Sequence, residues 1–339
     1  MSSIPAERLL DIRGLRTHFF TDSGVIRAVD GVDLWVDRRE ILGVVGESGC
    51  GKTMMARSIL RIVPKPGRVV AGRIELEGKD LLGLSGAQMR RVRGDAISMI
   101  FQEPMVSLNP VYRVGNQIEE ILSTHRRALR RAERRERVME LLRMVDIPSP
   151  ERRVRSYPHE LSGGMRQRVV IAMALACGNP RLVIADEPTT ALDVTIQAQI
   201  LDLFKKLQQD LGMSVIMITH DLGVVSETAN RVAVMYAGSV VEQAAVRALF
   251  ETPLHPYTRG LLRSLPRRGR DSRKGRLHTI AGTVPNLLDL PPGCKFFDRC
   301  PHALADVCRG TEPALEEAAN GHWVRCCRVR EIEHEGDPA

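Results

Sequence analysis

The stretch from Gly46 to Thr53 carries residue types that bind phosphate groups. Its sequence, GESGCGKT, matches the pattern G-x-x-x-x-G-K-[ST] and follows an apolar run directly. In such a loop the glycines let backbone N–H groups converge on phosphates, the lysine neutralises the β and γ phosphates, and the last hydroxyl can ligate Mg²⁺. The sequence therefore predicts a nucleotide site formed by Gly46, Glu47, Ser48, Gly49, Cys50, Gly51, Lys52 and Thr53.

A second motif supplies two adjacent carboxylates. The segment Leu182–Glu187 has the sequence LVIADE, an apolar run that ends in Asp186 and Glu187. The first carboxylate can hold Mg²⁺, and the second can orient or deprotonate an attacking water. The structural alternative is an acidic pair that only caps a helix. Together with the phosphate loop, the pair predicts nucleotide hydrolysis.

The elements that must position these motifs form an α/β pattern. Short apolar runs with β-branched residues alternate with longer helical patterns, which predicts a mainly parallel sheet covered by helices. Three runs are clear, namely Ile41–Val45, Leu182–Ala185 and Val215–Thr219, and a polar cluster follows each of them. Because ligands bind at the carboxyl ends of parallel strands, the function should lie at these loops.

Two further parts have different patterns. Alternation around Leu15–Phe20 and Val25–Trp35 predicts an antiparallel β portion, with turns at Gly24 and Gly31. Apolar residues spaced as on one helix face between Gln117 and Val145 predict a helical subdomain, inserted at about residues 103–170.

Composition sets the outline of the chain. At 339 residues, 43% hydrophobic and 27% charged, it is long enough for one large α/β domain and an appendage. Prolines, glycines and cysteines become frequent after residue 250. We therefore expect a catalytic domain over residues 1–250 and a small extension over 251–339.

The charge distribution argues against nucleic acid as a partner. The net charge is +8, with basic runs at Arg126–Arg137 and Arg267–Arg276, which predict a solvated helix face and a loop. No aromatic residue lies in either run to stack on bases.

The chain also lacks the sequence signals of a membrane span or of export. Its longest apolar run, Val169–Cys177, is far short of the roughly 18 residues needed to cross a bilayer. The first residues have no export-signal pattern, so we expect a cytoplasmic location and reduced or metal-bound cysteines.

The segment Leu161–Arg168 introduces a family resemblance. Its sequence, LSGGMRQR, resembles the signature of ATP-binding-cassette (ABC) ATPases, with methionine where glutamine is commoner. It also places a serine and two glycines at the start of an apolar helix, which is a second anion-binding helix N-terminus. The resemblance implies the ABC-type P-loop fold and a dimer in which the signature of one subunit closes over the ATP of the other. The signature residues are Ser162, Gly163, Gly164 and Met165.

Other marks of the ABC family occur in order. Gln102 stands in a Q-loop-like segment and is implied to reach Mg²⁺ or the lytic water. Asp193 stands in a D-loop-like segment. His220 stands in the H-loop-like segment Thr219–Asp221 and is implied to contact the γ-phosphate. Phe19 or Phe20 is expected to stack on adenine, and we favour Phe19.

The resemblance is closest to the ATPases of dipeptide and oligopeptide (also nickel) importers. Met105 and Met165 resemble the first of two paired ATPases, which implies a paralogous ATPase partner, two transmembrane permease subunits and an extracytoplasmic substrate-binding protein. It places the chain peripherally on the cytoplasmic face of the membrane. The substrate stays open between dipeptide, oligopeptide, nickel and another small solute, and the alternative is a soluble ABC ATPase without a membrane partner. The segments that carry the resemblance are Ala28–Val32, Ile100–Met105, Ser107–Pro110, Tyr157–Glu160 and His255–Thr258.

Four cysteines of the extension are the candidate metal ligands. Cys294, Cys300, Cys308 and Cys326 are separated by five, seven and seventeen residues, unlike the paired spacing of common zinc sites. The resemblance implies a 4Fe-4S cluster, for which four thiolates are a suitable ligand set. Structural zinc and unligated thiols stay open, and Cys327 is a rival for the fourth position.

Overall fold

The structure is a computed structural model that describes residues 8–102, 107–190, 192–265 and 279–335. It divides into two compact units. The first consists chiefly of Gly83–Ile218 with Val36–Ile41, and the second of Leu10–Trp35, Leu42–Leu82 and the chain from Thr219 onward. The units alternate along the sequence.

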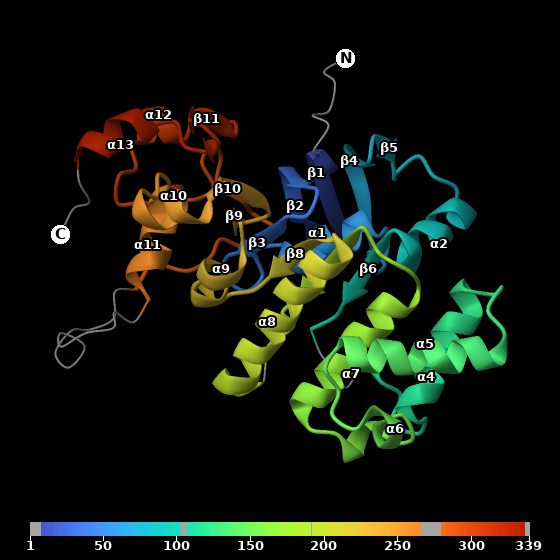
Figure 1. Cartoon of the computed structure of the whole chain (residues 1–339). Coiled ribbons are helices and arrows are strands. Elements are labelled where there is room, and N and C mark those ends of the chain that lie inside the picture. Colours follow the sequence, from blue (N-terminus) through green and yellow to red (C-terminus); the bar gives the residue numbers. More distant parts are fainter. Residues whose placement is uncertain (1–7, 103–106, 191, 266–278, 336–339) are drawn as a thin grey trace, which may run out of the picture. The chain divides into compact units, whose positions relative to one another are not determined.

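The first unit contains three parallel strands with their helices (Figure 1). The strands are β6 (Ile97–Ile100), β7 (Leu182–Asp186) and β8 (Ser214–Ile218), in the order β8-β7-β6. They pair in parallel, with Ile97 opposite Leu182 and Leu182 opposite Ser214. Every residue of β7 and β8 is buried, as expected of strands covered on both faces.

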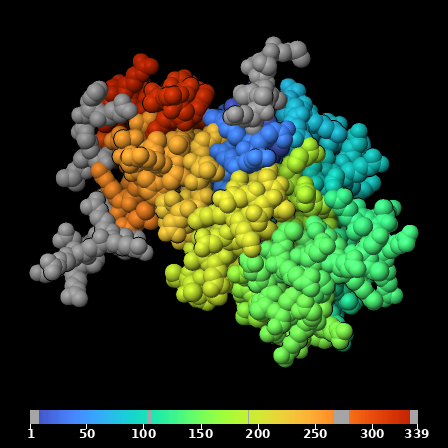
Figure 2. Space-filling model, viewed as in Figure 1, coloured from blue at the N-terminus to red at the C-terminus, as the bar shows by residue number. Residues whose placement is uncertain are grey.

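The helices of this unit include the predicted helical insertion. The pattern predicted between Gln117 and Val145 divides into two helices, because α4 ends at His125 and α5 begins at Arg131. Val138, Leu141 and Leu142 share the buried face of α5. Helices α4 and α5 pack against each other, and the green residues of this unit form one continuous surface in the space-filling view (Figure 2). The helices are α2 (Gly86–Asp95), α4 (Val114–His125), α5 (Arg131–Met144), α6 (Pro150–Arg153), α7 (Gly163–Ala176) and α8 (Val194–Leu211).

The second unit contains the predicted antiparallel sheet, in the order β2-β1-β4-β5. The prediction of a turn at Gly31 is wrong, because Gly31 lies inside β2 with a φ of 76°. A positive φ within a strand is what glycine permits, so its presence marks an irregular strand rather than a turn. The strands are β1 (Arg8–Thr21), β2 (Gly24–Asp37), β4 (Gly67–Leu76) and β5 (Lys79–Asp80).

A further group of strands in the second unit carries the phosphate loop and the extension. Strand β3 (Ile41–Val45) pairs in parallel with β9 (Arg231–Tyr236), and β10, β12 and β11 continue antiparallel beyond it. The remaining strands are β10 (Ser239–Ala245), β11 (Glu316–Ala319) and β12 (His322–Val324).

The extension contributes to the core of the second unit. Phe296 is 2% exposed and lies edge-on to Tyr236, with ring centroids 5.2 Å apart, while Tyr257 packs on Tyr236 at 4.6 Å. The residues around 250, in orange, and those of the extension after 300, in red, lie against one another (Figure 2). The helices of this unit are α1 (Lys52–Ile59), α9 (Leu222–Thr228), α10 (Val246–Glu251), α11 (Pro256–Arg263), α12 (Ala305–Cys308) and α13 (Val329–Glu335).

Several sequence expectations concern the chain as a whole. The division into residues 1–250 and 251–339 stays a prediction. The basic run Arg126–Arg137 is largely exposed, whereas Arg267–Arg276 lies outside the described residues. Among the described helices, none combines the length and the apolarity that crossing a membrane would take.

Candidate active site

The phosphate loop lies in the second unit between β3 and α1. Gly46 and Gly51 have φ values of 150° and 104°. A Cβ at Gly46 would lie 2.2 Å from the Met235 carbonyl oxygen, and one at Gly51 would lie 2.2 Å from the Ala28 carbonyl oxygen. Both positions therefore require glycine, and the glycines of the motif serve close backbone packing as well as phosphate access.

Lys52 is the charged residue of this loop. It is 6% exposed, and its Nζ donates to the carbonyl oxygens of Gly46 at 2.7 Å and of Glu47 at 3.0 Å. The sulfur of Cys50 is 3.7 Å from the same ammonium and is fully buried. The lysine is thus folded back along its own loop, where an ammonium can neutralise bound phosphates.

His220 lies near the start of the phosphate loop. The Thr219 N–H donates to the carbonyl oxygen of Val44 at 3.1 Å, which places the exposed His220 next to the carboxyl end of β3. The side chain of Asp221 caps α9 by accepting from the N–H groups of Gly223 and Val224. His220 therefore stands beside the phosphate loop, directly before the N-cap residue of α9.

The candidates for adenine stacking are on β1. Phe19 is partly buried, and its ring fits against Gly67, where a Cβ would lie 2.6 Å from the ring. Phe20 is 39% exposed, and the Arg68 guanidinium covers its ring at 4.3 Å. The choice between the two rings stays a prediction.

The carboxylates of the second motif lie in the first unit. Asp186 is the last residue of β7 and is 2% exposed. Glu187 follows it with a φ of 48°, which is uncommon for a residue with a side chain. Its Oε2 accepts from Gln102 Nε2 at 3.0 Å and from Thr190 Oγ1 at 2.9 Å. The structure thus brings Glu187 and Gln102 together at a strained backbone position, as active sites often do.

Thr190 is a contact that the sequence analysis missed. Its hydroxyl stands three residues after Glu187, a spacing that can return a side chain to the carboxylate in a turn. The signal was present, but a threonine in a loop has many alternative partners.

The signature loop opens α7 in the first unit. Ser162 is the N-cap, and its Oγ accepts from the Met165 N–H at 3.3 Å. A Cβ on Gly164 would lie 2.5 Å from Ile196 of α8, so Gly164 allows the two helix starts to approach closely. Asp193 caps α8 by accepting from the Ile196 N–H at 2.9 Å. Signature and D-loop residues therefore begin neighbouring helices.

The cysteines of the extension gather on one small cavity of the second unit. Cys294, Cys300, Cys308, Cys326 and Cys327 all line it, and the sulfurs of Cys308 and Cys327 are 3.7 Å apart. Burial raises the pKa of Cys300 and of Cys326 to about 12. Within the described residues, no group of three or more histidine, cysteine or acidic side chains is arranged to hold a metal ion.

Comparisons with known proteins agree with this geometry. The model of the ABC transporter family matches residues 29–190, and that of the oligopeptide/dipeptide transporter C-terminal region matches residues 241–308. A probable peptide ABC transporter ATP-binding protein of Sinorhizobium fredii is 55% identical over 98% of both chains. The oligopeptide transport ATP-binding protein AppD of Bacillus subtilis is 51% identical, over 94% of this chain and 96% of that protein.

Two more similarities concern dipeptide transport and the fold. The dipeptide transport ATP-binding protein DppD of Escherichia coli is 48% identical over 94% of this chain and 96% of its own. A dimeric ATP-binding cassette, solved in a post-hydrolysis state with ADP and phosphate, superposes with a TM-score of 0.63 at 29% identity, covering 70% of this chain and 99% of that one. The predicted fold class and family resemblance are therefore confirmed, and the chain belongs to the oligopeptide/dipeptide branch of the ABC transporter ATP-binding proteins.

Proposed function

We propose that this chain is the ATP-hydrolysing, energy-coupling subunit of an importer for dipeptides or oligopeptides. The observation that carries the proposal is that the phosphate loop and the candidate catalytic carboxylate are each held by hydrogen bonds within their own unit. Lys52 lies folded in a glycine-built loop, and Glu187 is held by Gln102 and Thr190. The names of the relatives, at 48–55% identity, support peptides as the cargo.

Within this site each group has a proposed role. The loop Gly46–Thr53 binds the phosphates of ATP, with Thr53, Gln102 and Asp186 holding Mg²⁺. Glu187 orients or deprotonates the attacking water, and His220 contacts the γ-phosphate. The phosphate loop and His220 belong to the second unit, and Gln102, Asp186 and Glu187 belong to the first.

The signature residues act on a nucleotide held by a second ATPase. The loop Ser162–Met165 presents backbone N–H groups at a helix start, and Ser162 and Gly163 are exposed. We infer a pair with a paralogous ATPase, docked on two transmembrane permease subunits of a system with an extracytoplasmic substrate-binding protein. The chain then lies peripherally on the cytoplasmic face of the membrane.

The proposal of a thiolate-bound group rests on the number of cysteines that line one cavity. Four or five thiols on one cavity match the ligand set of a 4Fe-4S cluster, with Cys294, Cys300, Cys308 and Cys326 as ligands and Cys327 as the rival fourth. A zinc ion would use the same donors. Iron and sulfide analysis after anaerobic purification separates these readings, because stoichiometric iron with sulfide supports the cluster, and zinc or no metal argues against it.

The test of the transport function is co-purification from the native cell. The tagged chain is extracted from membranes with mild detergent and its partners are identified by mass spectrometry, with an untagged strain as control. Recovery of two multi-span proteins and a second ATPase supports the importer. ATP hydrolysis by that complex is then measured with dipeptides, oligopeptides or nickel and the binding protein, to identify the cargo. Recovery of soluble partners alone would support the soluble ABC ATPase instead.

A further inference from the structure

Arg299, in the cysteine-bearing segment Cys294–Cys300, forms hydrogen bonds to the phosphate loop of the second unit. Arg299 Nη1 donates to Glu47 Oε2 at 2.7 Å, and Nη2 donates to Glu47 Oε1 at 3.0 Å. The side chain of Arg299 is 5% exposed and that of Glu47 is 28% exposed. Two parallel hydrogen bonds between guanidinium and carboxylate are the strongest geometry available to this pair. Glu47 is the second residue of the loop, so the contact joins two segments 252 positions apart.

The guanidinium is fixed by groups other than Glu47. Arg299 Nε donates to the carbonyl oxygen of Ala281 at 3.0 Å, and Nη1 also reaches the Tyr236 hydroxyl at 3.4 Å. The hydrogen bonds from Arg299 to Glu47 raise the pKa of the guanidinium, so it is charged at every physiological pH. A charged group held in this way is preorganised to fix the carboxylate it contacts.

The backbone of the same loop residue has its own support. The Glu47 N–H donates to the hydroxyl oxygen of Tyr257 at 3.0 Å. Burial raises the pKa of Tyr257, so the hydroxyl stays neutral. Glu47 is thus held through both its side chain and its backbone by residues that follow residue 250.

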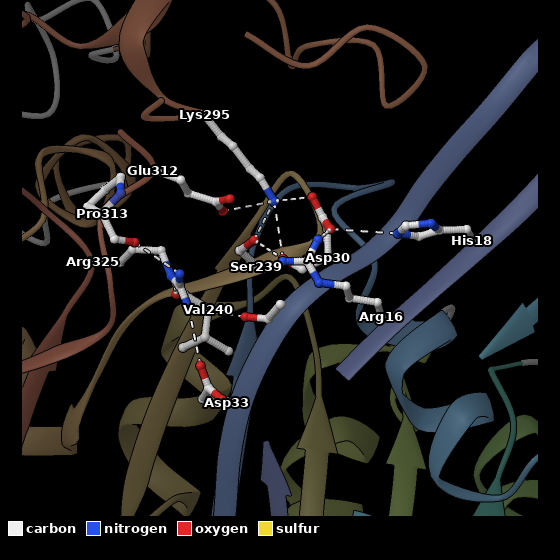
Figure 3. A network of polar contacts seen from close by, with 11 residues as sticks. Arg16, His18, Asp30, Asp33, Ser239, Val240, Lys295, Glu312, Pro313 and Arg325 are labelled. Atoms are coloured by element: carbon white, nitrogen blue, oxygen red, sulfur yellow. Dashed lines mark hydrogen bonds and ion pairs between the residues drawn. The ribbon is translucent and has the colours of Figure 1, made fainter. Parts of the chain in front are cut away.

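Lys295, from the same segment, supports the phosphate loop through Asp30 and Gly238. Its Nζ donates to Asp30 Oδ2 at 3.0 Å and to Ser239 Oγ at 2.6 Å (Figure 3). The Asp30 N–H donates to the Gly238 carbonyl oxygen at 2.8 Å, and the Gly238 N–H donates to the Cys50 carbonyl oxygen at 2.9 Å. Burial alone would raise the pKa of Asp30, but the Lys295 ammonium and the Arg16 guanidinium hold it below its usual range.

The negative charge of Glu47 explains why its ion pair with Arg299 affects ATP binding. The triphosphate of ATP is a polyanion, and a carboxylate within its binding loop repels it. Arg299 neutralises that carboxylate through two hydrogen bonds, and its guanidinium is itself held by the Ala281 carbonyl oxygen and the Tyr236 hydroxyl. Removal of Arg299 would leave a free anion in a loop whose other charged group, Lys52, must then serve both the carboxylate and the phosphates.

We propose that Arg299 is a positioning residue for nucleotide binding, which neutralises Glu47 and holds the phosphate loop in its binding conformation from the cysteine-bearing segment. The proposal rests on the assignment of Gly46–Thr53 as the ATP site and deepens it. It makes the segment Cys294–Cys300 a part of the nucleotide-binding machinery. Cys300 is the residue next to Arg299, so the thiol cavity and the phosphate loop share one short segment.

The test is a double-substitution cycle in the full-length chain. The Kd for a fluorescent methylanthraniloyl derivative of ATP with Mg²⁺ is measured for the wild type, Glu47→Gln, Arg299→Met and the double variant. We expect Arg299→Met to weaken binding by about 10- to 100-fold, the range for hydrogen bonds to charged groups. In the Glu47→Gln background the same substitution should change Kd by less than about threefold, because the repelling carboxylate is gone.

Matched controls separate positioning from general destabilisation. Arg328→Met removes another buried arginine of the extension, whose guanidinium donates to the His302 carbonyl oxygen and pairs with Glu331, and it should leave Kd within about threefold. Arg299→Lys keeps the charge but loses the paired geometry, so its Kd should lie between those of the wild type and Arg299→Met, and it serves if the methionine variant does not fold. In ATP hydrolysis, the Arg299 variants should raise KM with kcat within about threefold.

The outcomes are distinguishable. An equal loss of affinity in both backgrounds, or no loss at all, would overturn the positioning role of Arg299. Failure of the wild type to bind the nucleotide, or unchanged binding by Lys52→Ala, would instead overturn the assignment of the ATP site itself.

Discussion

Two glycine-containing loops of this molecule lead into helices, and they differ in the groups that they supply for binding an anion. The phosphate loop before α1 contains Lys52, which is 6% exposed and bonded to its own loop. The signature loop before α7 has no cationic residue among Ser162–Met165, and its first two residues are exposed. The first loop holds its own counter-charge, whereas the second offers only backbone N–H groups and one hydroxyl.

The supports of the two loops differ in the same way. The phosphate loop is held by side chains from far along the chain, including Arg299 and Tyr257. The signature loop lies against the start of α8, an element of its own unit, through the contact of Gly164 with Ile196. A prebuilt, charged cradle can bind a polyanion alone, whereas an exposed and uncharged helix start contributes once another molecule supplies the anion. This difference favours a binding role for the first loop and a closing role for the second.

The largest effect should come from Glu187→Gln, because it stops the chemistry after both loops have engaged. The amide cannot accept a proton from water, so kcat for ATP hydrolysis should fall by about 10²- to 10⁴-fold with ATP binding retained. The variant should then accumulate an ATP-dependent dimer, measured by size-exclusion chromatography with light scattering. Unchanged steady-state hydrolysis would refute the role of Glu187.

The second prediction separates the loops directly. Ser162→Arg places a bulky side chain at the exposed start of α7, so hydrolysis should fall by about 100-fold, comparable with the loss of a backbone-donor site. The Kd of the isolated chain for ATP should change by less than about threefold, because the phosphate loop binds alone. Lys52→Ala is the matched control and should weaken ATP binding. Equal loss of binding in both variants would remove the distinction between the loops.

A third prediction concerns the stability of the region that supports the phosphate loop. His255 is the N-cap of α11, and its Nδ1 accepts from the N–H of Tyr257. Burial lowers the pKa of His255 to about 4 from 6.5, although the nearby Glu242 opposes the shift. Because the unfolded chain takes up a proton between pH 6.5 and 4 and the folded chain does not, stability should fall as pH falls through this window.

Between pH 7.5 and 5 the loss should be about 2 kcal/mol, given about 1.4 kcal/mol per unit of pKa difference. Urea unfolding at both pH values measures it, followed by tyrosine fluorescence and circular dichroism. His255→Asn keeps a side-chain acceptor for the helix cap but does not titrate, so its stability should lose this part of the pH dependence. An identical pH dependence in the two proteins would show that His255 does not titrate across this window.

The same contrast explains how far the sequence could predict the structure. The strand Ile41–Val45 was predicted with its observed bounds, because a fully buried run ends sharply at the glycine that starts the loop. The bounds of such a strand depend on local pattern. The family resemblance implied that Gln102 reaches Mg²⁺ or the lytic water, and that role stays a prediction; its hydrogen bond to Glu187 at 3.0 Å was not foreseen.

What the sequence did not predict depends on distant partners. Arg299 stands in a segment that was notable only for its cysteines, and nothing in its local pattern identifies Glu47 as its partner. Gly31 was expected at a turn, because a positive φ inside a strand has the same sequence signal as a positive φ in a turn. Pairings across more than 200 residues are set by packing of the whole second unit, which a local pattern does not encode.

The smallest change in ATP affinity is expected from substitution of Cys50. Its thiol also allows a test by alkylation, which the signature loop, having no cysteine, does not allow. The sulfur fills the space behind Gly46, where a Cβ would lie 2.8 Å from it, so Cys50→Ala should change the Kd for ATP by less than about threefold. The thiol of Cys50 is buried whereas Cys327 is exposed, so Cys50 should react with N-ethylmaleimide more slowly than Cys327, as followed by peptide mass spectrometry. Once alkylated at Cys50, the chain should lose ATP binding, and Cys50→Ala treated in the same way should keep it. Fast alkylation with ATP binding retained would show that the phosphate loop opens readily, and the contrast with the signature loop would then lie in charge alone and not in a prebuilt cradle.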